Sequence, residues 1–265
     1  MKTADSNPKK ALISEILPFV VRIAAEHDMD RIAALRHATY GKHLPELAEK
    51  LRQPEASDYE LGCAVIVAVS KMDGSLLGTL RTHANVFKPL PLQASLRLPE
   101  KFQDMRMVEA TRLCVIGHSS SSMVRNALFK ALFEYCTLQN VDWLMAAGRR
   151  PIDRIYDWLL FNDVADTGKF YPMAHANGLP HRVMSLSSIA EPIWSAAKHP
   201  LYRFVFETYH PDIDLSEVAN LHFPWLCPET INDIGDTKNS LNNLEIPHQS
   251  GSFAHNVDGS WTYAN

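Results

Sequence analysis

The stretch MVEATRLCVIGHSSSSMVRNALFKALFEY, residues 107–135, decides the fold of this chain, because it joins an apolar strand to an amphipathic helix. In its first part apolar residues fall on both sides of a two-residue repeat, which predicts a strand covered on both faces. One predicted face carries Val108, Ala110, Cys114 and Ile116, and the other carries Thr111, Leu113 and Val115. Glu109 and Arg112 lie within this apolar strand, so we expect the active site here.

The second part of the stretch predicts a helix with one apolar side. Its apolar residues recur at helical spacing, and its polar side is predicted to carry Arg125, Asn126 and Lys130. The turn before it contains Ser119, Ser120 and Ser121. A helix N-terminus offers free backbone N–H groups and the positive end of the helix dipole. With Arg125 in the first turn, the sequence predicts an anion site.

Composition excludes several classes of protein. The 265 residues are 46% hydrophobic, enough for a packed core, and 26 basic against 30 acidic residues give a net charge of -4, which disfavours nucleic acid as a partner. The apolar run near the N-terminus is interrupted by Glu15, Pro18 and Arg22, so we expect no transmembrane segment, no signal peptide and a cytoplasmic protein. Without CxxC or HExxH spacing among the cysteines and histidines, we expect no metal site.

The rest of the chain predicts an α/β protein with a mixed sheet and helices on its faces. Residues 61–70 and 75–83 flank the turn signal Lys71–Gly74 and predict an antiparallel hairpin. Further strands are expected at 19–24, 141–147 and 181–188, and helices at 31–43, 44–51, 151–161 and 193–209, the last interrupted near Pro200. Residues 162–180 are rich in Gly and Pro and predict an irregular loop. We expect one domain over residues 1–210 and a partly irregular C-terminal extension over 211–265.

Basic residues gather next to the predicted anion site. Between residues 120 and 155 the chain carries Arg125, Lys130, Arg149, Arg150 and Arg154 against only Glu134, Asp142 and Asp153. This local excess of positive charge suits an acidic partner.

Four short motifs, taken in order, resemble a known family. In chain order they are Arg36 and Tyr40 in LRHATYGKH, Asp58 before the second strand, Arg81 in GTLRTH, and Glu109-x-x-Arg112. Over roughly residues 19–190 this order resembles the acyl-homoserine-lactone synthases and the related N-acyl amino acid synthases, a branch of the GNAT acyltransferases. The resemblance implies a GNAT-like acyl-CoA N-acyltransferase fold, α/β (α+β), with a mixed central sheet.

The resemblance also implies roles for individual residues. Glu109 and Arg112 are the expected catalytic residues, with Glu109 as the general base, and Arg36, Tyr40, Asp58 and Arg81 are expected to bind substrate. Arg81 or Arg112 is expected to hold the carboxylate of the acceptor. Backbone N–H groups of Leu113, Cys114 and Val115 are expected near the oxyanion. An amino acid is the expected acceptor, and a fatty acyl chain is expected to enter between the fourth and fifth strands.

The turn at residues 117–122, GHSSSS, lacks the glycine-rich pyrophosphate loop of acetyl-CoA-using GNAT enzymes. We therefore expect no bound cofactor and an acyl-phosphopantetheine thioester on acyl carrier protein as co-substrate, although acyl-CoA stays possible. Ser119, Ser120, Ser121 and Arg125 are expected to hold the phosphate, and Lys130, Arg149 and Arg150 to meet the acidic carrier.

Several alternatives stay open at this stage. The enzyme alternative is a lactone synthase that uses S-adenosylmethionine, and the alternative from another class is a non-catalytic GNAT-fold protein that binds acyl carrier protein or lipid. Glu109 and Arg112 can also be purely structural, as a buried ion pair or as part of a hydrogen-bonded network. A serine hydrolase is disfavoured, because its G-x-S-x-G motif would need Gly where this chain has Ser121.

Overall fold

The computed structural model describes residues 13–117, 121–220, 252–255 and 261–264. Its main sheet has the strand order β11-β2-β3-β4-β5-β6-β9-β7, and β8 pairs with β9. The strands that build the centre are β2 (Phe19–Ile23), β3 (Cys63–Ser70), β4 (Leu76–Ala84), β5 (Met107–Val115), β6 (Trp143–Gly148) and β9 (Leu179–Ser187). The strands predicted from the sequence, including the β3–β4 hairpin, are thus confirmed, and so is the mixed α/β sheet.

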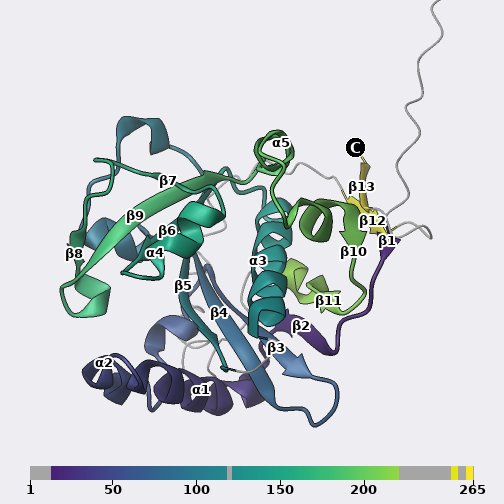
Figure 1. Cartoon of the computed structure of the whole chain (residues 1–265), viewed down its shortest axis with the longest axis horizontal. Helices are drawn as coiled ribbons and strands as arrows, with labels where there is room; N and C mark the ends of the chain where they lie inside the picture. Colours follow the sequence, from purple (N-terminus) through teal and green to yellow (C-terminus); the bar gives the residue numbers. More distant parts are fainter. Residues whose placement is uncertain (1–12, 118–120, 221–251, 256–260, 265) are drawn as a thin grey trace, which may run out of the picture. The chain divides into compact units, whose positions relative to one another are not determined.

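Helices cover both faces of this sheet (Figure 1). One face is covered by α1 (Met29–Gly41), which α2 (Pro45–Lys50) follows, and the other by α3 (Ser121–Leu138). Gly78 of β4 marks the α3 face, because a side chain there would meet Val124 and Leu128 at 3.0–3.1 Å. The α1 face packs Ile32 and Leu35 of the helix against Val65 and Val67 of β3. This apolar packing fixes α1 over the middle of the sheet.

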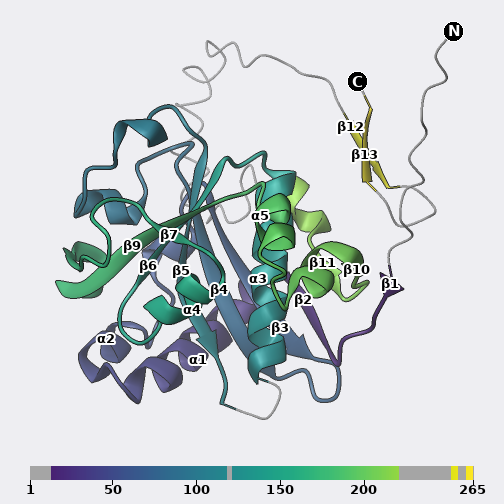
Figure 2. The ribbon, with the colours of Figure 1, turned by 45° about the horizontal axis from the view of Figure 1, so that its top comes forward.

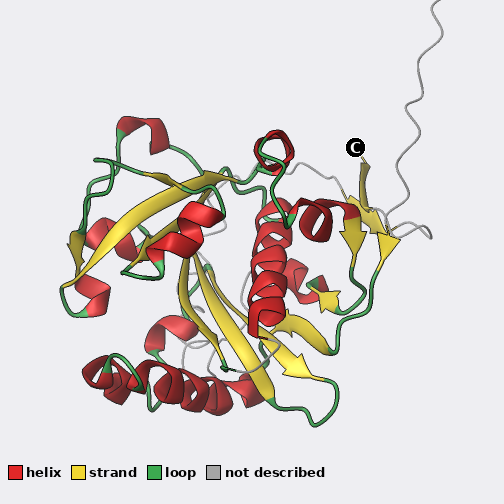
Figure 3. Ribbon diagram, viewed as in Figure 1, coloured by secondary structure: helices red, strands yellow, loops and turns green. Residues whose placement is uncertain are grey.

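The sheet opens between β5 and β6. These two strands run parallel and pair only from Met107 opposite Trp143 to Ala110 opposite Ala146, although β5 continues to Val115. Beyond Ala110, β5 pairs with β4 alone. Figure 3 shows that β3, β4 and β5 run in a clearly different direction from β9. The carboxyl half of β5 therefore has a free side, next to the predicted active site.

The connection between β4 and β5 covers the α1 face beyond the end of that helix. It contains two short 3-10 turns, Pro91–Ala94 and Glu100–Phe102, with Leu92 and Phe102 fully buried. Leu92 and Phe102 belong to an apolar cluster with Met107, Met145 and Met173. The connection is thus packed down onto the sheet.

Two predictions about the second half of the chain are wrong. Residues 162–180 contain β7 (Asn162–Asp163) and β8 (Tyr171–Met173), which pair with β9 at the edge of the sheet, where proline is tolerated. The predicted helix at 193–209 is reduced to α5 (Glu191–Ala196), a short π-helix Arg203–Glu207 and the strand β10 (Thr208–Tyr209). Lys198, with φ of 50°, and Pro200 end the first helix. The predicted helix at 151–161 is the shorter α4 (Asp153–Trp158).

The chain divides into two compact units, residues 1–224 and 225–265. Within the first, β1 (Ile13–Ser14) pairs with β10, and β11 (Ile213–Asp214) pairs with β2 at the edge of the main sheet. The first residues of the predicted C-terminal extension therefore contribute to the sheet. In the second unit, β12 (Ser252–His255) and β13 (Trp261–Ala264) pair antiparallel. Figure 2 shows these elements in a second view.

Candidate active site

The α1 face of β4 and β5 carries a row of polar side chains. Arg81 pairs across the strands with Thr111, and His83 with Glu109. Residues directly opposite each other in an antiparallel pair point to the same face, so these four side chains lie together. Arg81 donates from Nε to the Thr111 hydroxyl at 3.2 Å. Arg81, His83 and Glu109 are at most 4% exposed, so this row is held away from solvent.

A β-bulge in β5 adds Arg112 to the same face. Thr79 lies opposite Cys114 and Arg81 opposite Thr111, so one extra residue of β5 is inserted between them. Arg112 has φ of 52°, a left-handed conformation that a regular strand does not contain. The regular two-residue repeat of the sequence places Cys114 and Thr111 on opposite faces. That prediction is wrong, because the bulge shifts the alternation and brings both to the α1 face.

Three arginines and two carboxylates form one network under this face. Arg36 of α1 donates to both oxygens of Asp58 at 2.8 Å, and Arg81 Nη1 donates to Asp58 at 3.0 Å. Arg81 also reaches Glu55 at 3.0 Å, and Arg112 grips Glu55 with two hydrogen bonds of 2.7 and 2.6 Å. Three guanidinium groups against two carboxylates leave one positive charge, and Arg36 Nε and Nη2 have no hydrogen-bond partner among the described residues.

Asp58 is the last residue of a 3-10 turn, Ala56–Asp58, and its carboxylate accepts a hydrogen bond of 2.9 Å from the backbone N–H of Glu55. The segment just before β3 thus presents both carboxylates to the arginines. Arg36, Asp58 and Arg81 were predicted as site residues from the sequence, whereas Glu55 was not. The spacing of the two carboxylates could have identified Glu55, because it lies three residues before Asp58 and both ends of such a short turn can face the same way.

Glu109 is separate from this ion network. It is fully buried, and its Oε2 accepts the backbone N–H of Leu92 at 2.8 Å, while Oε1 has no partner in the described structure. Burial raises the pKa of Glu109 to about 8, against the effect of that hydrogen bond and of Arg81. The structural alternative in which Glu109 pairs with Arg112 is wrong, since Arg112 pairs with Glu55. Glu109 is left with an unused acceptor oxygen.

A cavity of about 660 Å³ lies next to part of this network. Its polar lining includes Arg81, Arg112 and Glu55 of the network, the neighbouring His83 and Thr111, and Glu60 and Lys88, whereas Glu109 is not among its lining residues. Its apolar lining comes from Pro89, Leu90, Pro91 and Ala94, and His175 from the segment after β8 also lines it. The cavity therefore combines a surplus of positive charge with an apolar wall.

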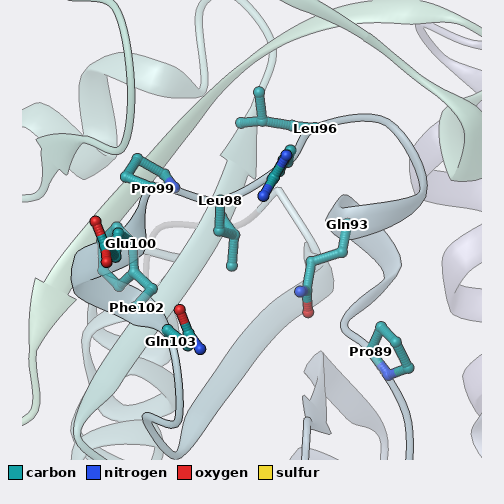
Figure 4. A pocket seen from close by; sticks show the side chains of 9 residues that line it. Pro89, Gln93, Leu96, Leu98, Pro99, Glu100, Phe102 and Gln103 are labelled. Carbon is teal, nitrogen blue, oxygen red and sulfur yellow. The ribbon is translucent and has the colours of Figure 1, made fainter.

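A second hollow, of about 900 Å³, lies in the connection between β4 and β5. Figure 4 shows its lining side chains, which all come from residues 89–103. Pro89 and Gln93 line both hollows, so they share a wall. The second one contains none of the residues of the ion network.

Tyr40 and Cys114 complete the α1 face. Cys114 is 1% exposed, burial raises its pKa to about 12, and Tyr40 forms a hydrogen bond with it. A thiol of this kind stays protonated and is a poor nucleophile. Neither residue lines the 660 Å³ cavity.

The predicted donor-binding residues are only partly brought together. Ser119 and Ser120 lie outside the described residues, whereas Ser121 opens α3 and Arg125 is half-buried in its first turns. Arg149 is half-buried at the end of β6, and the exposed Arg150 guanidinium lies 5.0 Å from the Phe170 ring.

The predicted exposure of Lys130 is wrong. Lys130 is 2% exposed, and its Nζ donates to the carbonyls of Phe204 and Thr208 and lies 3.6 Å from Glu134. The C-terminal segment after α5 packs over this side of α3, which helical spacing alone does not reveal. Lys130 therefore binds this segment and is not presented to a partner.

Fold and site together define a GNAT-type N-acyltransferase, with a bulged central strand, a sheet that opens beside it and a buried carboxylate at the opening. A sequence model of the family "FeeM: N-acyl amino acid synthase FeeM" matches residues 31–183. The chain belongs to this family.

Solved structures agree with this fold. The structure of FeeM, an N-acyl amino acid synthase from uncultured soil microbes, superimposes with a TM-score of 0.50 at 16% identity, covering 70% of this chain and 99% of that one. The CoA-dependent acyl-homoserine lactone synthase BjaI, solved with SAM and isopentyl-CoA, gives a TM-score of 0.49 at 13% identity over 77% of this chain and 98% of that one. No curated protein matches the sequence.

Within the described ranges, no helix is both long and apolar enough to cross a membrane. The same ranges contain no cluster of three or more His, Cys, Asp or Glu side chains placed to hold a metal ion.

Proposed function

We propose that this enzyme transfers a long-chain fatty acyl group from acyl carrier protein to the α-amine of an amino acid, giving an N-acyl amino acid. The observation that carries the proposal is the arginine–carboxylate network with one surplus positive charge, which lines a cavity through Arg81, Arg112 and Glu55, together with the nearby buried Glu109, one oxygen of which has no partner in the described structure. The family match to N-acyl amino acid synthases supports the same activity.

The acceptor's carboxylate belongs at the network. Arg81 and Arg112 both line the cavity, and a guanidinium suits a carboxylate because two N–H groups can donate side by side. The surplus charge of the network is neutralised when one carboxylate binds. This polarity also orients the acceptor, since the amine then points away from the arginines.

Glu109 is the proposed general base. Its Oε1 is free to accept a proton, and a pKa of about 8 places it close to physiological pH, where a base is most effective. The neutral amine then attacks the thioester carbonyl directly, with no covalent enzyme intermediate. The bulge leaves β5 with an extra residue outside the regular ladder, and N–H groups of Leu113 to Val115 are the proposed donors to the oxyanion.

The proposed donor is a thioester on acyl carrier protein. Ser121 and Arg125 at the start of α3 lie where a phosphate gains from the helix dipole, and Arg149 and Arg150 follow β6. Lys130 is removed from this set because it is buried. Carrier proteins present an acidic surface, which these arginines complement.

The acyl chain belongs in the opening between β5 and β6. The last paired residues, Ala110 and Ala146, have small side chains and are buried on the α3 face, where Leu128 and Ala131 are also fully buried. Burying each methylene contributes about 0.8 kcal/mol, so a long chain gains much more than an acetyl group. Ala146→Phe is expected to shorten the preferred chain while the thermal melt stays cooperative. A native enzyme that prefers acetyl over C12 to C16 donors contradicts this part of the proposal.

Mass spectrometry of the products tests the proposed function. The native enzyme is incubated with dodecanoyl-acyl carrier protein, dodecanoyl-CoA, a pool of the twenty amino acids and S-adenosylmethionine. The expected product is one or a few N-dodecanoyl amino acids, formed faster from the carrier protein. N-dodecanoyl homoserine lactone as the main product identifies a lactone synthase, and the absence of any acylated product removes the proposal.

A further inference from the structure

His83 is a buried histidine whose hydrogen-bonding capacity is unused. It is 3% exposed, lines the 660 Å³ cavity, and neither Nδ1 nor Nε2 has a hydrogen-bond partner among the described residues. Leaving a buried polar group without a hydrogen-bond partner is destabilising, so such a group calls for an explanation. Here the cavity supplies one, because a ligand in it can reach the ring.

His83 also lies directly across the strands from Glu109. Cβ atoms of such pairs are about 4.5–5.5 Å apart, and both side chains point to the same face. Glu109 Oε1 is unpaired as well, so both members of this cross-strand pair have polar side-chain atoms without a hydrogen-bond partner in the described structure. Burial, then the charges of Arg81 and Lys88, lower the pKa of His83 to about 3, so the ring is neutral before substrate binds.

The proposed acyl transfer removes two protons from one nitrogen. The amino acid arrives as an ammonium and must lose one proton before attack, and the nitrogen must lose a second after the C–N bond forms. A single carboxylate that still holds the first proton cannot take the second. We propose that His83 is a second catalytic residue, which contacts the acceptor nitrogen and takes the second proton while Glu109 takes the first.

This inference rests on the proposed function, and its steps balance as follows. Glu109 accepts one proton from the ammonium, and the nitrogen lone pair then bonds to the carbonyl carbon, moving the π pair onto oxygen. His83 takes the second proton from the positively charged nitrogen. The C=O bond forms again, the C–S bond breaks with its pair on sulfur, and the thiolate receives the proton from His83. Glu109 returns its proton to water, and the products are an amide and a thiol.

Steady-state kinetics of His83→Gln test the inference, with product formation by the native enzyme as the first check. Glutamine keeps hydrogen bonding but cannot carry a proton, so kcat is expected to fall about 10²-fold while KM for the acceptor changes little. His210→Gln is the matched control, because His210 is 2% exposed with both nitrogens unpaired and does not line the cavity. It is expected to keep the native kcat. His83→Asn serves as the second variant, and thermal melts confirm that all three fold.

An aminooxy acid as acceptor separates the two protons, because its amine is already neutral at pH 7. With this acceptor Glu109→Gln is expected to recover most of its lost rate, and His83→Gln is not. An unchanged kcat in folded His83→Gln or His83→Asn, or a loss confined to KM, overturns the role of His83. If the native enzyme makes no N-acyl amino acid, it is the proposed function that fails.

Discussion

Two arginine–carboxylate clusters in this protein have opposite charge balances. Under β4 and β5, Arg36, Arg81 and Arg112 outnumber Glu55 and Asp58, and the cluster lines a cavity. On the far side of β9, the single Arg182 pairs with Asp163 at 3.0 Å, Asp157 at 2.8 Å and Asp153 at 3.5 Å. That cluster has an excess of two negative charges and ties α4 to β7 and β9. Both clusters join elements, but only the one with the surplus guanidinium lines a cavity, which is why we propose it as the ligand site.

The largest expected effect concerns the carboxylate that belongs to neither cluster. Glu109→Gln and Glu109→Ala are expected to fold and to lose acyl transfer by about 10²-fold or more, the usual scale of a general base. Single-turnover rates with a saturating acyl donor measure this loss. Native rates in both variants would leave Glu109 without a catalytic role.

The next effect compares the two clusters directly. Arg112→Lys removes one of two hydrogen bonds to Glu55 and the planar fork, a charge-assisted bond of about 1.5–3 kcal/mol, so kcat/KM is expected to fall about tenfold or more. Arg182→Lys makes the same change in the other cluster and is expected to keep kcat/KM within about twofold. If both variants lose the same activity and melt at the same temperature, the two clusters do not differ in their contribution to catalysis.

Arg149 and Arg150 form a third group, in which no salt bridge to a described carboxylate is found. Replacing both by Glu is expected to lower kcat/KM several-fold with the acyl carrier protein donor at low salt, and the loss should shrink as salt screens the charges. A dodecanoyl-pantetheine donor is the control, since it lacks the carrier surface. An equal loss with that donor would show that these arginines do not meet a carrier.

The last prediction concerns stability and not the rate of acyl transfer. Because the folded protein raises the pKa of Glu109 from 4.5 to about 8, it binds a proton that the unfolded chain has lost between these values. The contribution of Glu109 is therefore complete below about pH 4.5 and is lost as pH rises through about 8, at about 1.4 kcal/mol per pH unit. Glu109→Gln is expected to melt above the native protein at pH 9, and urea unfolding at several pH values measures the change. A native protein that gains stability relative to Glu109→Gln on going from pH 5 to 9 would contradict the raised pKa.

Much of the fold could be predicted from the sequence, because its strands and long helices carry clear apolar repeats. The central strand, the helix after it and the β3–β4 hairpin all follow from local pattern. The edge strands β7, β8 and β10 did not, since two or three residues give no repeat and their pairing is set by distant partners. The burial of Lys130 could not be predicted for the same reason, because its hydrogen-bond partners Phe204 and Thr208 lie more than seventy residues away in the sequence.

The candidate site was only half predictable. Arg36, Asp58 and Arg81 were found by motif, and the structure brings them into one network with Arg112. The bulge at Arg112 could not be foreseen, because a single inserted residue leaves no mark on the apolar pattern. Without the bulge, the sequence suggested Glu109 as the ion-pair partner of Arg112 or left that partner open. Glu55 and His83 were not identified as site residues.

The central claim is that the surplus positive charge under β4 and β5 holds the acceptor's carboxylate. It is tested most directly by comparing kcat/KM for the acceptor amino acid and for its primary amide, which keeps the amine but lacks the charge. The native enzyme and Arg182→Lys are expected to prefer the acid at least about tenfold, and Arg112→Lys is expected to lose most of that preference. A native enzyme that acylates the amide as efficiently as the acid would contradict the account.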